Sequence, residues 1–157
     1  MDAPRFGRRA PHPLLGAAVA SSVVAVDQLA KTVAPLLPSG LVAPAQNPDY
    51  AFGTVGGSAL ALIGGSIVVL AVFLAVIGRL ASRVGLSPAL PALIAGGMLG
   101  NTLDRINYGA VRDFLVVPSG IINLADVAVF AGVVALAVAF ATRIPRLIGQ
   151  PVARDAA

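Results

Sequence analysis

The sequence predicts an all-α membrane protein, folded as a bundle of four transmembrane helices in one domain, 1–157. Hydrophobic types make up 57% of its 157 residues and charged types only 11%, whereas a soluble domain carries about 25% charge. The mean hydropathy is +0.89. Four apolar segments approach or exceed the roughly 20 helical residues that cross a bilayer core. This composition excludes a soluble globular domain and a disordered chain.

The first predicted span, 14–37, is interrupted by Asp27, Gln28 and Lys31. The spans 58–77 and 86–103 contain no charged residue, and the span 121–141 contains a single one, Asp126. A cleaved secretory signal is the competing interpretation of the first segment. We disfavour it because the apolar stretch continues too far and its removal would worsen the charge balance.

The placement of basic residues predicts the orientation. With four spans, one side of the membrane receives eight arginines: Arg5, Arg8, Arg9, Arg79, Arg83, Arg143, Arg146 and Arg154. The other side receives Arg105 and Arg112, while Lys31 lies within a span. The positive-inside tendency then predicts cytoplasmic termini and outward loops 38–57 and 104–120. Within the first loop, apolar residues and the turn signal Asn47-Pro48-Asp49 predict a small strand on the membrane surface.

The composition excludes several classes of functional site. The chain has no Cys and only one His, His12, which leaves no thiolate nucleophile, no Cys-ligated metal and no basis for a histidine metal site. The topology places His12 on the cytoplasmic side. The basic residues sit at the edges of apolar segments and form no single patch, so we expect no nucleic-acid partner.

Ionisable residues within a span are functional candidates, because a charge at the helix centre costs roughly 2.5–3.5 kcal/mol. Asp27 and Lys31 are four residues apart and share a helix face, where they can pair. We favour an intrahelical ion pair near the outer membrane edge over a direct chemical role. Gly96 and Gly100 form a small-xxx-small pair that predicts close helix packing.

Polar residues also gather where the last two spans meet the outer boundary. Asn101, Asp104 and Arg105 end the third span. Asn123 and Asp126 begin the fourth, three residues apart, which predicts that they share a helix face. Taken alone, Asn101, Asp104 and Arg105 are explained equally well as polar residues at the point where a helix emerges from the membrane. The fourth span has no basic residue, so Asp126 needs a partner elsewhere, a proton or a water-filled cleft.

Asp113 and Asp126 are both predicted at this outer boundary. Two unit charges 4 Å apart interact by roughly 4 kcal/mol at an effective dielectric of 20. Two carboxylates in one site therefore do not both ionise easily, which yields one general acid and one general base around a water, as aspartic peptide hydrolysis requires. Spacing alone leaves this pairing open, since Asp104 is an equally plausible partner.

Four sequence blocks occur in a familiar order. They are Asp27-Gln28-x-x-Lys31; Asn47 followed by Ala51-Phe52-Gly53; Gly100-Asn101-x-x-Asp104-Arg105 with Gly109-x-Val111-x-Asp113-Phe114; and Asn123-x-Ala125-Asp126. In this order, and in a chain of this length, they resemble the lipoprotein signal peptidase (signal peptidase II) family of bacterial membrane aspartic peptidases. Departures from the family are Pro48-Asp49 after Asn47, Ile122 in place of phenylalanine, and a short interval between Asp113 and Asp126.

The resemblance implies a four-helix transmembrane bundle with a small extracytoplasmic β-cradle. It implies that Asp113 and Asp126 are the catalytic dyad. It assigns binding or supporting roles to further residues: Asn47, Asn101, Arg105, Asn123, Asp27, Lys31 and Asp104. The implied activity is cleavage of the signal peptide from diacylglyceryl-modified prolipoproteins before the lipidated cysteine, at the outer face of the bacterial cytoplasmic membrane. Neither a metal nor a cofactor is implied, and we expect a monomer surrounded by membrane lipids.

Two alternatives use the same carboxylates. A small membrane transporter would use them for proton coupling or cation binding. A catalytically weakened relative would bind lipoprotein precursors without cleaving them. Because both dyad aspartates are present, we expect an active enzyme.

Overall fold

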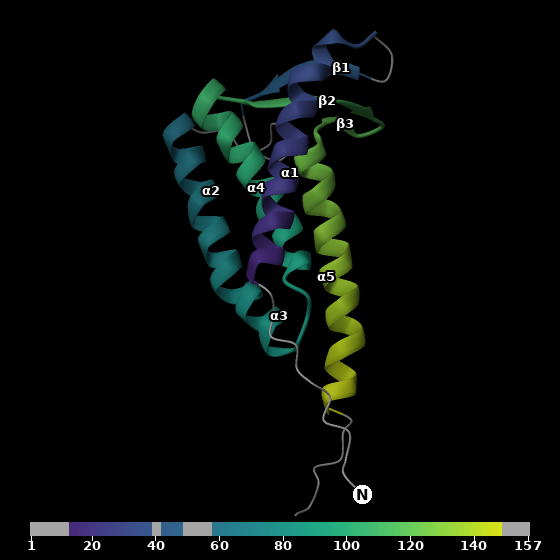
Figure 1. Cartoon of the computed structure of the whole chain (residues 1–157). Coiled ribbons are helices and arrows are strands. Elements are labelled where there is room, and N and C mark those ends of the chain that lie inside the picture. Colours follow the sequence, from purple (N-terminus) through teal and green to yellow (C-terminus); the bar gives the residue numbers. More distant parts are fainter. Residues whose placement is uncertain (1–12, 39–41, 49–57, 149–157) are drawn as a thin grey trace, which may run out of the picture.

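The fold is mostly helical, with one small sheet across one end of the helices (Figure 1). The computed structural model describes residues 13–38, 42–48 and 58–148. In this part of the chain the helical elements are α1 (Pro13–Val33) with the short 3-10 helix η1 (Ala34–Leu36), α2 (Ala59–Phe73) with the π-helix η2 (Leu74–Gly78), α3 (Arg79–Arg83), α4 (Ala89–Tyr108) and α5 (Leu124–Ile148).

Among the described residues, three helical stretches are long and apolar enough to cross a membrane: Leu14–Leu36, Leu60–Arg83 and Leu124–Ile144. They correspond to the first, second and fourth predicted spans. The helix itself continues past the span boundary expected at 77, because η2 and α3 extend it through Arg79 and Arg83. The chain leaves the helix at Gly85, whose φ of +69° is the left-handed conformation that ends many helices.

α4 corresponds to the third predicted span, but it is not one of the three most apolar helices. It packs against α1, α5 and α2. A Cβ atom at Gly96 would lie 2.8 Å from the carbonyl oxygen of Ala20 in α1, and a Cβ at Gly97 would collide with the carbonyl of Ala125 in α5. The predicted close packing at Gly96 is thus confirmed. The polar residues near its end, Asn101, Thr102, Asp104 and Arg105, account for its lower hydropathy.

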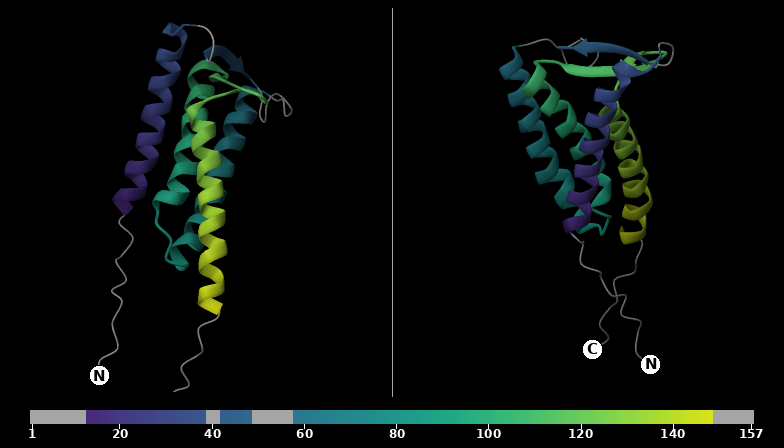
Figure 2. Two further views of the ribbon diagram at one scale, coloured as in Figure 1. Left: turned by 90° about the vertical axis from the view of Figure 1, so that its right-hand side faces the viewer. Right: turned by 45° about the horizontal axis from the view of Figure 1, so that its top comes forward.

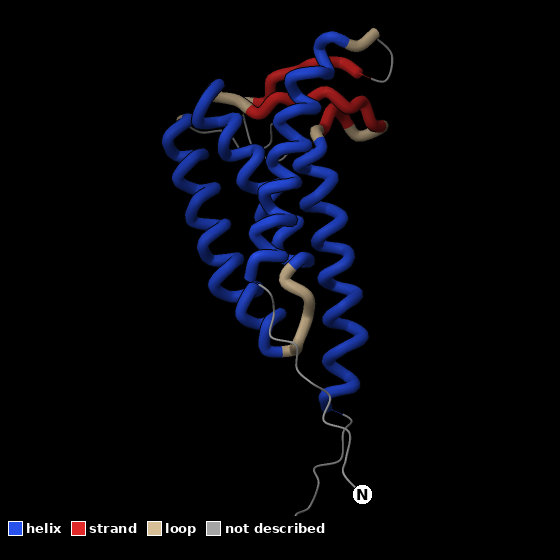
Figure 3. The backbone as a smooth tube through the Cα atoms, viewed as in Figure 1, coloured by secondary structure: helices blue, strands red, loops and turns tan. Residues whose placement is uncertain are grey.

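The sheet contains β1 (Val42–Asn47), β2 (Val111–Val117) and β3 (Gly120–Ile122), antiparallel in the order β1-β2-β3 (Figure 3). The strand predicted in the first outward loop is confirmed for 42–47, and 49–57 lie outside the described residues. The segment 104–120, predicted as a loop, instead completes α4 and forms most of the β2–β3 hairpin. Its apolar residues Val111, Phe114 and Leu115 favour a strand, and Gly109 with φ of +73° ends α4.

The start of α1 and the end of α5 lie at the same end of the bundle, opposite the sheet (Figure 2). Near that end a small apolar core forms around Ala81, Leu86, Ile94 and Leu136. Large apolar side chains are exposed on the outer helix faces, among them Leu14, Leu60, Val68 and Phe130. Such a continuous apolar exterior is typical of a surface that contacts lipid.

Candidate active site

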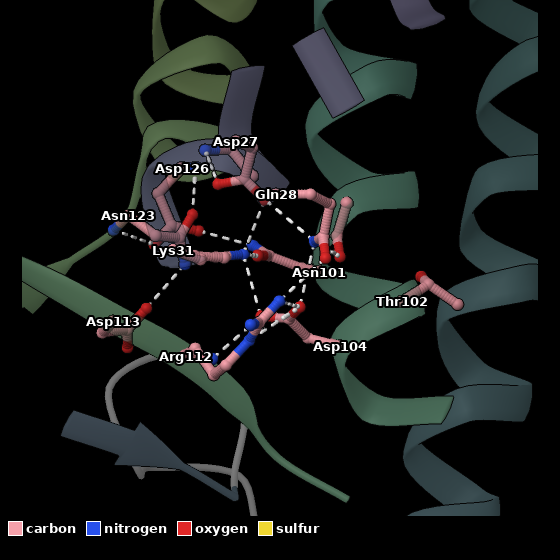
Figure 4. Close-up of polar contacts among 12 residues, drawn as sticks. Asp27, Gln28, Lys31, Asn101, Thr102, Asp104, Arg112, Asp113, Asn123 and Asp126 are labelled. Carbon is pink, nitrogen blue, oxygen red and sulfur yellow. Dashed lines mark hydrogen bonds and ion pairs between the residues drawn. The ribbon is translucent and has the colours of Figure 1, made fainter. Parts of the chain in front are cut away.

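Four aspartates from four elements meet at the end of the bundle that carries the sheet (Figure 4). Asp27 comes from α1, Asp104 from α4, Asp113 from β2 and Asp126 from α5. Asp27 and Asp104 are completely buried, and Asp113 is only 5% exposed. Burial of this many carboxyl groups requires partners for each of them, and these partners divide the cluster into two parts.

Lys31 is the first partner and joins α1 to α4. Its Nζ lies 2.7 Å from Asp27 Oδ2 and 3.0 Å from Asp104 Oδ2, and all three side chains are fully buried. It also donates a hydrogen bond of 2.9 Å to Asn101 Oδ1. The predicted ion pair within α1 is confirmed, but it is one part of a larger contact between helices. Three oxygen partners match the three donors of an ammonium group.

Arg112 is the second partner and supplies the charge that the sequence analysis missed. Its backbone N–H donates to Asp104 Oδ2 at 2.9 Å and its Nη2 donates to Asp104 Oδ1 at 2.9 Å. Nη2 also donates to Gln28 Oε1 at 2.8 Å, and the guanidinium lies 4.1 Å above the Tyr108 ring. Two buried carboxylates and one lysine leave a charge unbalanced. That imbalance was the sequence signal that could have identified Arg112.

Two further predicted site residues flank the cluster. Asn47 lies at the end of β1 opposite Val111, and its side-chain amide hydrogen-bonds to Asp113. Arg105 is buried in α4, and its Nη1 donates to the carbonyl oxygen of Asn101 at 3.5 Å. Ala51-Phe52-Gly53, from the second sequence block, lies outside the described residues.

Asn123 and Asp126 form a reciprocal cap at the start of α5. The backbone N–H of Asp126 donates to Asn123 Oδ1 at 2.9 Å, and the backbone N–H of Asn123 donates to Asp126 Oδ2 at 3.3 Å. This is the arrangement of a capping box, with Asn and Asp in the two capping positions. The prediction that both residues share a helix face is wrong for Asn123, which precedes the first turn.

Asn123 also connects the two predicted catalytic carboxyl groups. Its Nδ2 donates to Asp113 Oδ1 at 2.6 Å while its backbone N–H contacts Asp126. Asn123 is completely buried, so these bonds are shielded from solvent. Asn101 completes the set, since its Nδ2 donates to Asp126 Oδ1 at 2.8 Å. The hairpin between the two aspartates thus returns the chain so that one residue touches both.

The backbone of α4 makes room for the buried carboxylate of α1. A Cβ atom at Gly100 would lie 2.9 Å from Asp27 Oδ2. The other oxygen of Asp27 accepts a hydrogen bond of 2.9 Å from the backbone N–H of Ala125, in the first turn of α5. A carboxylate at a helix N-terminus is stabilised by the free N–H groups there. Asp27 therefore fixes the helix start that carries Asp126.

A cleft of about 250 Å³ opens beside Asp113. Residues of β1, β2 and the end of the first helix line it: Lys31, Pro35, Pro44, Ala45, Gln46, Arg112, Asp113 and Phe114. Burial raises the pKa of Asp113 above the usual range, and the nearby Asp126 carboxylate raises it further, while the Asn123 amide opposes the shift. A carboxyl group that keeps its proton beside an ionised one can serve acid–base chemistry on a molecule in this cleft. Within the described residues, no group of three or more His, Cys, Asp or Glu side chains is placed to hold a metal ion.

Comparison with known proteins identifies similar sequences and structures. The family model described as signal peptidase (SPase) II matches residues 19–142. A lipoprotein signal peptidase of Rhodopseudomonas palustris is 33% identical over 140 residues, which are 79% of this chain and 79% of that protein. A lipoprotein signal peptidase of Nitrobacter hamburgensis is 42% identical over 86 residues, about half of each chain (49%).

The similarity extends to the fold. A bacterial membrane enzyme structure, determined by the in meso method at 2.3 Å resolution, superposes with a TM-score of 0.72 at 21% identity. The match covers 90% of this chain and 96% of that one. The helices and the small sheet therefore belong to an arrangement already observed in a bacterial membrane protein.

Proposed function

The chain belongs to the signal peptidase II family, and from this membership we propose that it cleaves the signal peptide from diacylglyceryl-modified prolipoproteins, immediately before the lipidated cysteine. The proposed catalytic groups are Asp113 and Asp126. The observation that carries the proposal is Asn123, which bonds to both carboxyl groups and so keeps Asp126 near Asp113, the one of the two that lines the cleft. The mechanism is that of an aspartic peptidase, without a metal or covalent intermediate.

The chemistry requires one protonated and one ionised carboxyl group. The ionised group accepts a proton from water as the water oxygen bonds to the peptide carbonyl carbon, and the protonated group donates to the carbonyl oxygen. When the C–N bond breaks, the former base gives its proton to the leaving nitrogen. A hydroxyl of the collapsing intermediate returns a proton to the former acid, so the dyad regains its starting state. General acid–base catalysis contributes typically 10²–10⁴-fold, and positioning adds to it.

The proposed setting is the bacterial cytoplasmic membrane, with four spans and both termini in the cytoplasm. The fourth crossing is α4, which joins the three more apolar helices in the bundle. The sheet and the dyad then lie at the outer surface, where the junction between a signal peptide and its lipidated cysteine emerges from the membrane. We propose that residues 1–157 act as one domain, as a monomer, with lipids and lipid-modified precursors as partners. A tag inserted in the loop 38–57 should be reached by protease from outside the cell.

A processing assay with purified protein tests this function. We expect the parent protein to cleave a prolipoprotein that carries diacylglyceryl on its cysteine, giving two products whose masses sum to the precursor plus one water. The unlipidated precursor, otherwise identical, should remain uncut. The Rhodopseudomonas palustris relative serves as the positive control. Binding of the precursor without cleavage, while that control cleaves, would contradict an active peptidase and favour a weakened relative. A transporter would instead show ion or solute flux that depends on the aspartates.

A further inference from the structure

The contact between Lys31 and Asn101 links the ion-pair network to the dyad. Lys31 donates to Asn101 Oδ1 at 2.9 Å, and Asn101 Nδ2 donates to Asp126 Oδ1 at 2.8 Å. The chain of contacts thus runs from a buried cation, through one amide, to a proposed catalytic carboxyl group. Asp27 and Asp104 hold the other two donors of the ammonium group, so Lys31 has little freedom to turn away.

The ammonium group determines how the Asn101 amide is oriented. An ammonium group has only donors, so the Asn101 atom at 2.9 Å from Nζ must be the carbonyl oxygen. The amide NH₂ group is then forced to point the other way, toward Asp126. Without the cation, the amide could rotate and present its oxygen to Asp126 as an acceptor. Lys31 therefore makes Asn101 a permanent donor to this carboxyl group.

The two carboxyl groups of the dyad consequently have different surroundings. Both oxygens of Asp126 accept hydrogen bonds from N–H groups: Oδ1 from the Asn101 amide and Oδ2 from the backbone of Asn123. Donors on both oxygens stabilise the ionised form, because a proton there would face another donor. Asp113 lies in the buried strand and lines the cleft, with amide partners in Asn123 and Asn47. Of the two carboxyl groups only Asp113 lines the cleft, so it is the one beside a bound carbonyl oxygen, to which the acid donates.

We propose that Lys31, acting through Asn101, assigns the roles in the dyad, so that Asp126 is the base that deprotonates water and Asp113 is the acid. This inference rests on the proposed peptidase function and adds a division of labour to it. Lys31 is a positioning residue, since it acts on Asp126 through Asn101. The charged groups that face Asp126 are Lys31 and Asp27 from α1 and Asp113 from β2, and Asp104 is paired with Arg112.

Two variants test the relay in different ways. N101L removes the amide and leaves the ion pairs of Lys31 in place. The double variant D27N/K31Q removes one buried anion together with one buried cation, so the direct charge effects on Asp126 largely cancel. Because glutamine has both a donor and an acceptor, the orientation of the Asn101 amide is no longer fixed. T102V is the matched control, because Thr102 is the next residue of α4, its hydroxyl bonds to Met98 of the same helix, and it points away from the cluster (Figure 4).

The readouts are the pH dependence of kcat/KM and the infrared band of the protonated Asp126 carboxyl group, isolated by subtracting the spectrum of D126N. We expect the acidic limb and the infrared midpoint to move up by about one pH unit in N101L and in D27N/K31Q. The midpoints of the triple variant D27N/K31Q/N101L should equal those of N101L, because both sets of changes break the same relay. KM should stay within about twofold of the parent value, since Asn101 does not line the cleft.

Parental midpoints in N101L would overturn the inference, as would a shift in N101L combined with a parental midpoint in D27N/K31Q. If D27N/K31Q does not fold, D27N/K31M takes its place, because methionine has no donor to hold the Asn101 oxygen. The infrared titration needs no substrate, so it tests the relay even if the parent protein fails to cleave the lipidated precursor. Failure of cleavage with a shifted infrared midpoint would reject the proposed function and keep the relay.

Discussion

The four clustered aspartates form two pairs with different partners; Asp27, Asp104 and Asp113 are buried and Asp126 is half-buried. Asp27 and Asp104 are held by the cations Lys31 and Arg112 through contacts of 2.7–3.0 Å. Asp113 and Asp126 accept hydrogen bonds from the amide groups of Asn101 and Asn123. The first pair has its negative charge neutralised by direct ion pairs, whereas the second pair is held in place by neutral donors.

This difference separates stability from reactivity. A carboxylate in a buried ion pair is stable only with its partner and has no reason to change its protonation. A carboxyl group held by amides is oriented, yet its charge stays sensitive to its neighbours. The cation-bound pair links α1, α4 and the start of β2, and the amide-bound pair is the one proposed to exchange protons with water and substrate. Variants that convert one situation into the other test this distinction.

The largest expected effect is the removal of Asp104. D104A leaves the buried Lys31 and the partly exposed Arg112 near one another without the carboxylate between them, and breaking a buried pair typically costs about 3–5 kcal/mol. We expect a large fall in the unfolding temperature in detergent, followed by circular dichroism because the chain contains no Trp and no Cys. D104N keeps one acceptor oxygen, so its unfolding temperature should fall less than that of D104A. Equal unfolding temperatures for D104A and the parent would contradict the role given to this pair.

A smaller effect is expected from one added methyl group at the α4–α5 contact. In G97A the new Cβ atom meets the backbone carbonyl of Ala125, which cannot rotate away, so α5 must shift with its attached Asp126. Overpacking of this kind costs typically 1–3 kcal/mol. The control G64A places a methyl group where no atom lies within 4 Å and should not destabilise its helix. If both variants unfold at the parental temperature, the close contact is not needed.

The pH profile of cleavage tests the state of the amide-bound pair. Because burial and the charge of Asp126 raise the pKa of Asp113, this group keeps its proton above the ordinary aspartate value of about 3.9. We expect a bell-shaped pH profile of the cleavage rate. Its basic limb, where Asp113 loses its proton, should lie above that value and should be absent in D113N. Rates measured over a series of buffers will show it. A decline that begins near the ordinary aspartate value would contradict the protonated state.

The smallest effect is a change in how stability depends on pH. Below its ordinary pKa Asp113 is neutral in both the folded and the unfolded chain, and the raised pKa of the folded state means that stability is lost as the pH rises through it. D113N has no such proton and should escape this loss. The unfolding temperature of D113N relative to the parent should therefore increase with pH. A constant difference between the two proteins would reject the raised pKa.

Much of the architecture could be predicted because hydropathy and spacing are local signals. The long apolar runs gave the helices around 14–37, 58–77 and 121–141, and Asn47 marks the strand found at 42–47. The length of the second helix could not be read from charge, because Arg79 and Arg83 are compatible with either a loop or a helix end. The strand within 104–120 is not evident from the local pattern, because β2 pairs with β1, which is distant in the chain, and β3 then pairs with β2.

The site was predictable in its residue types and less so in its connections. The spacing of Asp27 and Lys31 gave their ion pair, but the inclusion of Asp104 depends on how α1 packs on α4. Arg112 was counted as a loop charge because its partner comes from the preceding helix. Asn123 was placed on a helix face, whereas its position as a cap lets it touch both Asp113 and Asp126. Contacts across elements follow from tertiary packing, which periodicity does not report.

The most direct test of the central claim compares D113N and D126N with T102V and the parent in cleaving a diacylglyceryl prolipoprotein. Asparagine keeps the size of each side chain and its acceptor oxygen while removing the exchangeable proton or charge. The account predicts that both variants fold and that each loses at least about 10²–10⁴-fold in rate, while T102V cleaves like the parent. Cleavage by folded D113N or D126N at the parental rate would contradict the claim that the two carboxyl groups share the reaction.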